Sequence, residues 1–511
     1  MSEFQPLVAL VVTPVVLAVA LPLVERWASR LAGPLATGAY LLQVGLAALV
    51  TSRVLSSGPV RYALGGFPPS YGIELVVDGL GAAVVLLVAV VGLGAHTYTR
   101  VHGPRDAAAR ALGLLLVAGL SGIAVTGDLF NLYVFLEIAG IAAYALVARS
   151  SGGAAALAAF RYLLVGTVGA TLYLLGVAYA YAATGTLNFA ALAAYLAKAG
   201  YSDPLVVAGF GFALVGLAVK IALVPAHTWL PDAHSKAPAS VSVLLSGLVT
   251  TAAVYALVRL LASVYTPAFL LANPVFRAAL VAAGVLSVLV GGVAAFRQHK
   301  LKRLLAYSTV AQLGLVVAGV GLASEIAVRG AVIHLLGHAV MKGGLFLAAG
   351  ALAERHGATT LEAYDGLGRR EPLLGGAVAV LALGMVGFPP TVGFVGKWYV
   401  AVGALQQGAW ALLAVVLLST FLSLAYFGPL VRRLFFPASD SAKPGHDDAS
   451  GHHATDGGTD YGVEKGESAP ADPLPVGAWV GPVVAAAATV GLGIGAHYVL
   501  RLVGPALEVF P

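Results

Sequence analysis

The chain has 511 residues, of which 59% are apolar and only 10% are charged, and its mean hydropathy is +0.91. Because a soluble domain carries about 25% charged residues, this composition excludes a soluble protein and indicates an integral membrane protein. The formal net charge is +6, and the absence of cysteine excludes disulfides, thiolate-bound clusters and a cysteine nucleophile in this chain.

Apolar runs of about 18 to 25 residues recur along almost the whole chain, and each is long enough to cross a hydrocarbon core as a helix. The runs do not alternate as the strands of a membrane barrel do. We therefore predict an all-α polytopic membrane protein with about fourteen transmembrane helices. The predicted spans are 6–24, 32–52, 75–95, 111–127, 129–148, 158–183, 205–233, 239–265, 275–296, 304–322, 327–351, 373–403, 409–435 and 475–500.

The distribution of basic residues predicts the orientation of these spans. Most lysines and arginines outside the spans fall in the loops after odd-numbered spans, so these loops are expected to be cytoplasmic and both termini to face outward. The N-terminal sequence MSEFQP carries no positive charge, so the first span is expected to be retained rather than cleaved.

Residues 437–474 form the only long polar segment, with two lysines against eight acids. Its Gly, Ser, Asp and Pro content predicts a flexible cytoplasmic linker to the last helix. A solvated tract is favoured over a metal site at His446, His452 and His453, so neither a metal nor a cofactor is expected.

Two predicted spans contain turn-forming sequence. Span 205–233 contains Pro225 and Pro231 in VPAHTWLP, and span 373–403 contains Pro389 and Pro390 in GFPPTVGF. Proline removes a helix hydrogen bond and clashes with the preceding turn, so we expect both helices to be discontinuous, although a simple kink is the alternative.

Paired broken helices are typical of transporters built from two repeats, because open backbone at membrane depth must line an enclosed or hydrated cavity. We predict two inverted five-helix repeats, formed by helices 4–8 and 9–13. The chain then divides into the N-terminal helices (1–110), the first repeat (111–270), the second repeat (271–436), the linker (437–474) and the C-terminal helix (475–511).

At least four charged residues lie inside predicted spans: Glu137, Lys220, Lys342 and Lys397. Each costs roughly 2.5–3.5 kcal/mol at the centre of a span. Structural ion pairs or snorkelling ends could account for one or two of them, but four favour a path for protons or ions.

His334, His338 and Lys342 have the spacing i, i+4, i+8, which places them on one face of a helix over about 12 Å. Neutral imidazole both donates and accepts hydrogen bonds, so this stripe predicts a proton relay, with satisfied core histidines as the alternative. Ser308, with its neighbours Thr309 and Gln312 in AYSTVAQLG, could hold intervening water.

Four stretches carry a resemblance to a known family: 220–247, 301–314, 334–347 and 387–398. Over about residues 75–435 the chain resembles the antiporter-like membrane subunits of complex I and of Mrp-type multisubunit sodium/proton antiporters. The resemblance implies a fourteen-helix subunit with inverted five-helix repeats and no cofactor of its own. The short C-terminal region resembles the D-type member of Mrp antiporters.

By resemblance, Glu137 corresponds to the family's fifth-helix glutamate and Lys220 to the lysine before the seventh-helix break, with His227 nearby. Lys342 with His338 would form the central relay, and Lys397 would pass the proton onward. A lysine at this last position resembles the D type of Mrp antiporters and some complex I subunits.

The chain departs from the family pattern at two positions. Thr251 stands about four residues past a Ser-Gly pair, where the family commonly has a lysine, so one protonatable step is missing. Lys300 stands where the family usually has aspartate.

The sequence therefore predicts a proton-translocating subunit of a multisubunit sodium/proton antiporter in the cell membrane of a prokaryote. Its expected partners are other subunits, the lipid bilayer, protons and sodium, and no nucleic acid. The main alternative is a proton-pumping subunit of complex I or of a membrane-bound hydrogenase. A self-contained solute transporter is a further alternative.

Overall fold

The computed structural model describes residues 5–511 except 70–71, 102, 104–105, 151 and 437–475, so the predicted linker lies outside the described residues. Twelve helices of the described part are long and apolar enough to cross a membrane. One of them, α1 (Pro6–Ser57), is divided into two arms at Ala28, and the shorter α16 (Pro372–Val386) and α17 (Val392–Gln406) together add one more pass. The described residues thus hold enough helix for the fourteen passes predicted.

The helices that build the first half of the bundle follow α1 in chain order. They are α2 (Gly79–Val101), α3 (Ala107–Val125), α4 (Leu129–Val147), α5 (Gly153–Thr184), α6 (Phe189–Ala199), α7 (Pro204–Ile221), α8 (Trp229–Lys236), α9 (Ala239–Leu244), the π-helical turn η2 (Leu245–Val249) and α10 (Thr250–Ser263). Asp106, Asp128 and Asp203 cap α3, α4 and α7, because their carboxylates accept from backbone N–H groups that the first turn leaves free.

The second half continues the same pattern. It comprises α11 (Thr266–Ala272), α12 (Pro274–Phe296), α13 (Leu301–Gly321), α14 (Glu325–His356), α15 (Leu367–Arg370), α16, α17, α18 (Trp410–Phe435), α19 (Val476–Ile494) and α20 (Ala496–Leu507). The last predicted span, 475–500, is therefore two helices that meet at Gly495.

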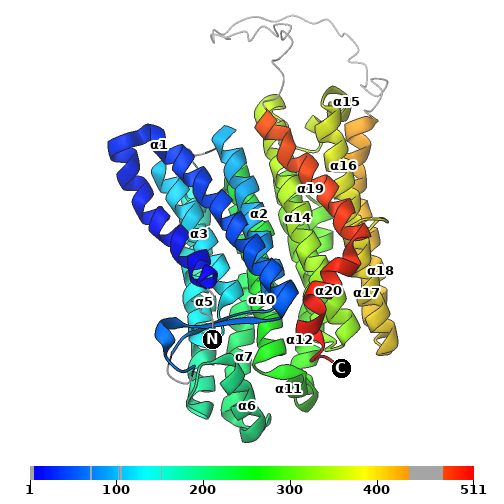
Figure 1. Cartoon of the computed structure of the whole chain (residues 1–511). Coiled ribbons are helices and arrows are strands. Elements are labelled where there is room, and N and C mark those ends of the chain that lie inside the picture. The colour runs from blue at the N-terminus through cyan, green and yellow to red at the C-terminus, as the bar shows by residue number, and fades with distance from the viewer. Residues whose placement is uncertain (1–4, 70–71, 102, 104–105, 151, 437–475) are drawn as a thin grey trace, which may run out of the picture.

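The two predicted repeats are present and run in opposite senses. The first consists of α3, α4, α5, α7 with α8, and α9 with α10; the second consists of α12, α13, α14, α16 with α17, and α18. In Figure 1, α3 starts at the upper end of the bundle and α12 at the lower end. Equivalent helices pack alike, since α5 contacts both α7 and α8, as α14 contacts both α16 and α17.

Helix α14 lies at the centre of the second repeat and is buried along nearly its whole length. It contacts α13, α16, α17 and α19. Gly396 of α17 lies against the backbone of His334, where an added Cβ would come within 2.5 Å of the histidine Cβ. Small residues thus let α17 approach the polar stripe of α14 closely.

A short antiparallel hairpin, β1 (Val60–Ala63) and β2 (Glu74–Val77), was not predicted, and it delays the start of the third pass from residue 75 to Gly79. Directly after β2, Asp78 accepts two hydrogen bonds from Arg259, at 2.6 and 2.8 Å. This bidentate pair fastens the start of α2 to α10.

Candidate functional site

Glu137 and Lys220 form an ion pair between α4 and α7, with Lys220 Nζ 2.6 Å from Glu137 Oε1. Their side chains are only 20% and 9% exposed. Because little water screens the pair, each charge depends strongly on the other. The structure therefore brings together the two residues that the sequence suggested as a unit.

The break in the seventh pass begins at Ala222, two residues after Lys220. Helix α7 ends at Ile221, Ala222 takes a left-handed conformation with φ 66°, and Val224 N–H donates to Ser287 Oγ of α12 at 3.0 Å. Pro225 and His227 lie in the open segment, as expected. The prediction that Pro231 helps to open the helix is wrong, because Pro231 lies in the first turn of α8, where proline removes no intrahelical hydrogen bond.

A small cavity lies beside Lys220, lined by Tyr144, Tyr162 and Trp229 among others. The rings of Tyr162 and Trp229 are stacked, with centroids 4.1 Å apart, and Trp229 Nε1 donates to the Val219 carbonyl at 3.0 Å. The cavity volume of about 20 Å³ suffices for about one water molecule. Sequence reasoning missed this aromatic wall, although Trp229 lies in the sequence VPAHTWLP that predicted the break.

The second break separates α16 from α17 and contains both Pro389 and Pro390, as predicted. Lys397 of α17 is 5% exposed, and its Nζ donates to the carbonyl of Val386, the last residue of α16, at 2.9 Å. The C-terminal end of a helix carries partial negative charge, which favours a cation there. Lys397 is thus held by a helix end instead of a carboxylate.

Lys342 lies in the middle of α14 and is fully buried. Its Nζ donates to the Leu305 carbonyl of α13 at 2.6 Å and to the hydroxyl of Ser308. Among the described residues no carboxylate pairs with Lys342. Ser308 therefore contacts the lysine directly.

The two histidines of the predicted stripe are fully buried on α14. His334 Nε2 lies 2.8 Å from Gln312 Oε1, and Gln312 in turn donates to Ser423 Oγ of α18 at 3.1 Å. Neither ring nitrogen of His338 has a hydrogen-bond partner in the described part of the chain. The stripe thus links α13, α14 and α18 at one end and leaves an unbonded imidazole beside Lys342.

The π-helical turn η2 is a site feature that the sequence did not suggest. It contains Ser246, which shares a hydrogen bond of 2.8 Å with Thr309 of α13. Thr251 follows one turn later, 1% exposed, and its hydroxyl has no partner among the described residues. Since π-helical turns often mark functional sites, η2 belongs to the candidate site, and the sequence carries no local signal for it.

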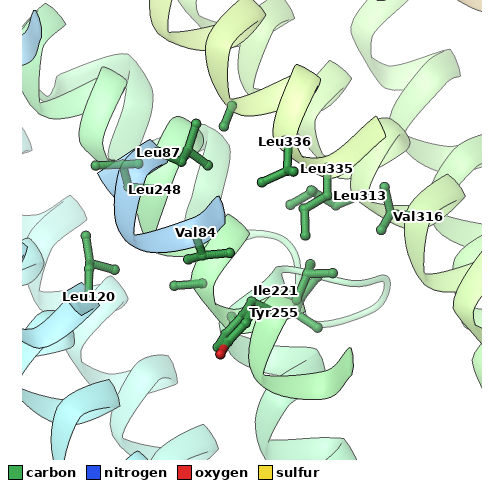
Figure 2. Packing of buried hydrophobic residues seen from close by; sticks show 14 of the residues in the cluster. Val84, Leu87, Leu120, Ile221, Leu248, Tyr255, Leu313, Val316, Leu335 and Leu336 are labelled. Atoms are coloured by element: carbon green, nitrogen blue, oxygen red, sulfur yellow. The ribbon is translucent and has the colours of Figure 1, made fainter. Parts of the chain in front are cut away.

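The polar groups form separate clusters instead of a continuous chain. Ile221, the residue after Lys220, belongs to the same buried apolar cluster as Leu313 of α13 and Leu335 of α14 (Figure 2). Among the described side chains, no direct hydrogen bond connects the Lys220 pair to Lys342. Movement of a proton between them requires mobile side chains or water between these apolar groups.

Comparison with known proteins identifies the family. Residues 126–423, more than half of the chain, match the family model described as "NADH:quinone oxidoreductase/Mrp antiporter, TM". The chain belongs to this family. This confirms the resemblance recognised in the sequence, and the matched range contains all five residues of the predicted relay.

Two curated relatives and one solved structure illustrate the range of the family. The chain is 41% identical to the N-type subunit of the NADH-quinone oxidoreductase of Desulforudis audaxviator, over 82% of this chain and 86% of the relative. It is 30% identical to the D-type subunit of the Na(+)/H(+) antiporter of Bacillus subtilis, over 81% and 84% of the two chains.

The structural neighbour is a chain of the membrane-bound sulfane sulfur reductase, an archaeal respiratory membrane complex. The TM-score is 0.87 at 29% identity, with 99% of this chain and 98% of the neighbour covered. The protein is therefore an antiporter-like, multi-pass membrane subunit of a family that includes both antiporter and respiratory members.

Proposed function

We propose that the chain is the proton-translocating subunit of a multisubunit complex in the plasma membrane of a prokaryote. The observation that carries this proposal is the ion pair of Glu137 and Lys220, held beside an open helix end and a small cavity. Burying charged groups inside a membrane costs free energy, so such groups are rare in transmembrane segments. Those that are present often mark ion or proton paths.

In the proposed mechanism Glu137 controls the charge of Lys220. While the carboxylate lies 2.6 Å away, it stabilises the protonated amine. When it moves away, the buried ammonium loses its counter-ion, and burial then favours release of the proton. The proton passes to Lys342 and His338 in the centre of the protein and leaves through Lys397, with His227, His334, Ser308 and Thr251 as supporting positions.

Two sources of energy fit this relay. In a sodium/proton antiporter, inward proton flow drives sodium out, because each elementary charge gains about 2.3 kcal/mol per 100 mV of membrane potential. The relative from the Bacillus subtilis antiporter supports this candidate, which is the one expected from the sequence. In a redox-driven complex, partner subunits drive the same relay, and the higher identity to the oxidoreductase relative favours this second candidate.

The relay is tested by Glu137→Ala and Lys220→Ala in the assembled complex, with dye-monitored proton movement in inverted membrane vesicles. We expect both variants to lose transport while the complex still assembles. Lys198→Ala, at an exposed position of α6, is the matched control and should behave as the wild type. Unchanged transport in either relay variant would refute the proposed gate.

The energy source is tested by purifying the complex in mild detergent and identifying its partners by mass spectrometry. Small Mrp-type partners would support the antiporter, and sodium should then drive proton movement in the vesicles. Iron–sulfur, nickel or quinone-site partners would support the redox-driven pump and exclude the antiporter.

A further inference from the structure

A second polar cavity, remote from the Lys220 pair, lies where α13 begins. Its volume is about 200 Å³, and its walls include Lys300, Lys302, Arg303, Thr359 and Tyr364. It lies at the end of the bundle where α14 ends and α15 follows, at the top of Figure 1. We refer to it as the α13 pocket.

The α13 pocket has three cationic residues and no acidic residue in its lining. Within the described part of the chain, no carboxylate lies within ion-pair distance of Lys300, Lys302 or Arg303. Lys302 Nζ donates one hydrogen bond, to the Ala237 carbonyl, which leaves two of its three N–H groups for another acceptor. Like charges gathered at one cavity repel each other, so an anion between them would be stabilised.

Two further donors in the pocket have no acceptor. Tyr364 is fully buried, and its hydroxyl has no hydrogen-bond partner among the described residues. The same holds for Nε of Arg303. Buried polar groups are rarely left unpaired, because each costs about 1–3 kcal/mol, so an acceptor that reaches these two atoms would be stabilised.

The backbone of α13 adds to this positive character. The helix has 21 residues, and no side chain caps its first turn, since Lys300 occupies the N-cap position. The N-terminus of a helix carries partial positive charge and free N–H groups, which bind phosphate and sulfate in many proteins. In α13 the N–H groups of Leu301 and Arg303 already donate, to the Thr359 and Lys300 carbonyls, so the helix end adds its partial positive charge to that of the three cations.

The walls of the α13 pocket are held together by backbone hydrogen bonds. Leu301 N–H donates to the Thr359 carbonyl at 3.1 Å, and Leu361 N–H donates to the His299 carbonyl at 2.8 Å. These bonds fix the start of α13 against the segment that leads to Tyr364. The donors are therefore positioned before any ligand arrives, which lowers the entropic cost of binding.

We propose that the α13 pocket binds a phosphate group. A phosphate offers only acceptor oxygens and negative charge, which match the cations, the tyrosine hydroxyl and the helix end. The group is supplied either by a soluble phosphate or by the head group of an anionic phospholipid at the membrane surface.

The test uses the full chain in phosphatidylcholine nanodiscs, in a buffer without inorganic phosphate. One arm measures binding of radiolabelled inorganic phosphate by equilibrium dialysis. The other arm measures retention of phosphatidylglycerol by native mass spectrometry after incorporation into the nanodisc. Binding in the first arm assigns a soluble phosphate, and binding in the second arm alone assigns a lipid head group; either result supports the pocket.

Two variants locate the bound group. Lys300→Asp places a carboxylate at the N-cap and should weaken binding at least about tenfold. Tyr364→Phe removes only the hydroxyl and should weaken it roughly 2- to 13-fold, the range for one hydrogen bond. Lys198→Asp makes the same charge change at an exposed position of α6 and should leave binding unchanged.

Absence of binding in both arms would overturn the proposal. Wild-type phosphate affinity in both pocket variants would also overturn it. So would a loss of affinity in Lys198→Asp as large as that in Lys300→Asp, because it would indicate a general charge effect. Tyr364→Phe keeps the shape of the side chain, so the test stands even if Lys300→Asp does not fold.

Discussion

Lys220 and Lys342 are both buried lysines at the membrane interior, but their surroundings differ. Lys220 has a carboxylate 2.6 Å away and a cavity beside it. Lys342 has a backbone carbonyl and a serine hydroxyl, with no carboxylate among the described residues. The first lysine is part of an ion pair, whereas the amine of the second contacts only dipoles.

This difference separates two ways of controlling a buried charge. At Lys220 the charge is controlled by the distance to Glu137, so motion of one side chain is enough. At Lys342 no partner can move away, so its charge must respond to protons that arrive from elsewhere. The first site is suited to be a gate and the second to be a relay.

The largest effect is expected at the gate. Glu137→Gln keeps the shape of the side chain but leaves Lys220 buried without its counter-ion, which should abolish transport and lower the unfolding free energy by about 3–5 kcal/mol. The measurement combines dye-monitored proton movement with denaturation of the purified chain in detergent. A variant with wild-type stability would show that the pair is better hydrated than its burial suggests.

A contrasting result is expected for Lys342→Met. Met has a similar volume and no charge. No carboxylate is left unpaired, and the Leu305 carbonyl keeps the hydroxyls of Ser308 and Thr309 as donors, so the unfolding free energy should stay the same or rise by about 1–4 kcal/mol. Transport should nevertheless be lost. Lys220→Met is the comparison variant, since it strands Glu137 and should destabilise the protein. Equal destabilisation of the two variants would contradict the distinction between gate and relay.

Substitution of Lys397 should change the unfolding free energy by an amount between those expected for Glu137→Gln and Lys342→Met. Lys397→Met removes the donor to the Val386 carbonyl at the end of α16 and should cost about 1–3 kcal/mol, the cost of a buried acceptor left unsatisfied. Transport should fall because the outward step is lost. Thermal unfolding of Lys397→Met, measured in parallel with Lys342→Met, checks this. If Lys397→Met is as stable as the wild type, the Val386 carbonyl has found another donor.

Much of this fold could be predicted from the sequence, because bilayer thickness and backbone hydrogen bonding leave few alternatives to apolar helices. The breaks at Pro225 and Pro389 were predictable for the same physical reason, the missing N–H of proline. Pro231 was not, because proline has different effects in the first turn of a helix and in its interior, and the sequence does not mark where α8 begins.

The candidate site was predictable as residue types and not as contacts. Charge inside apolar runs identified Glu137 and Lys220, but their separation depends on the packing of α4 and α7. The sequence does not predict that Lys397 donates to a helix carbonyl whereas Lys220 pairs with a carboxylate. The π-helical turn at Ser246 arises from tertiary contacts of η2 with α14, so no local pattern predicts it.

The smallest expected effect is at Thr251, where the family resemblance would have supplied a lysine. Its hydroxyl is buried without a partner among the described residues, so Thr251→Val removes an unpaired polar group at constant shape and should raise the unfolding free energy by about 1 kcal/mol. Transport should fall slightly, because Thr251 is a supporting position of the proposed path between Lys220 and Lys342. Unchanged transport would show that the hydroxyl holds no part of this path. Thr251→Lys should be tolerated or raise activity. If Thr251→Lys is inactive and unassembled while Thr251→Val is fully active, this position lies in tightly packed protein. Lys220 and Lys342 would then be coupled only through motion of the apolar residues between them.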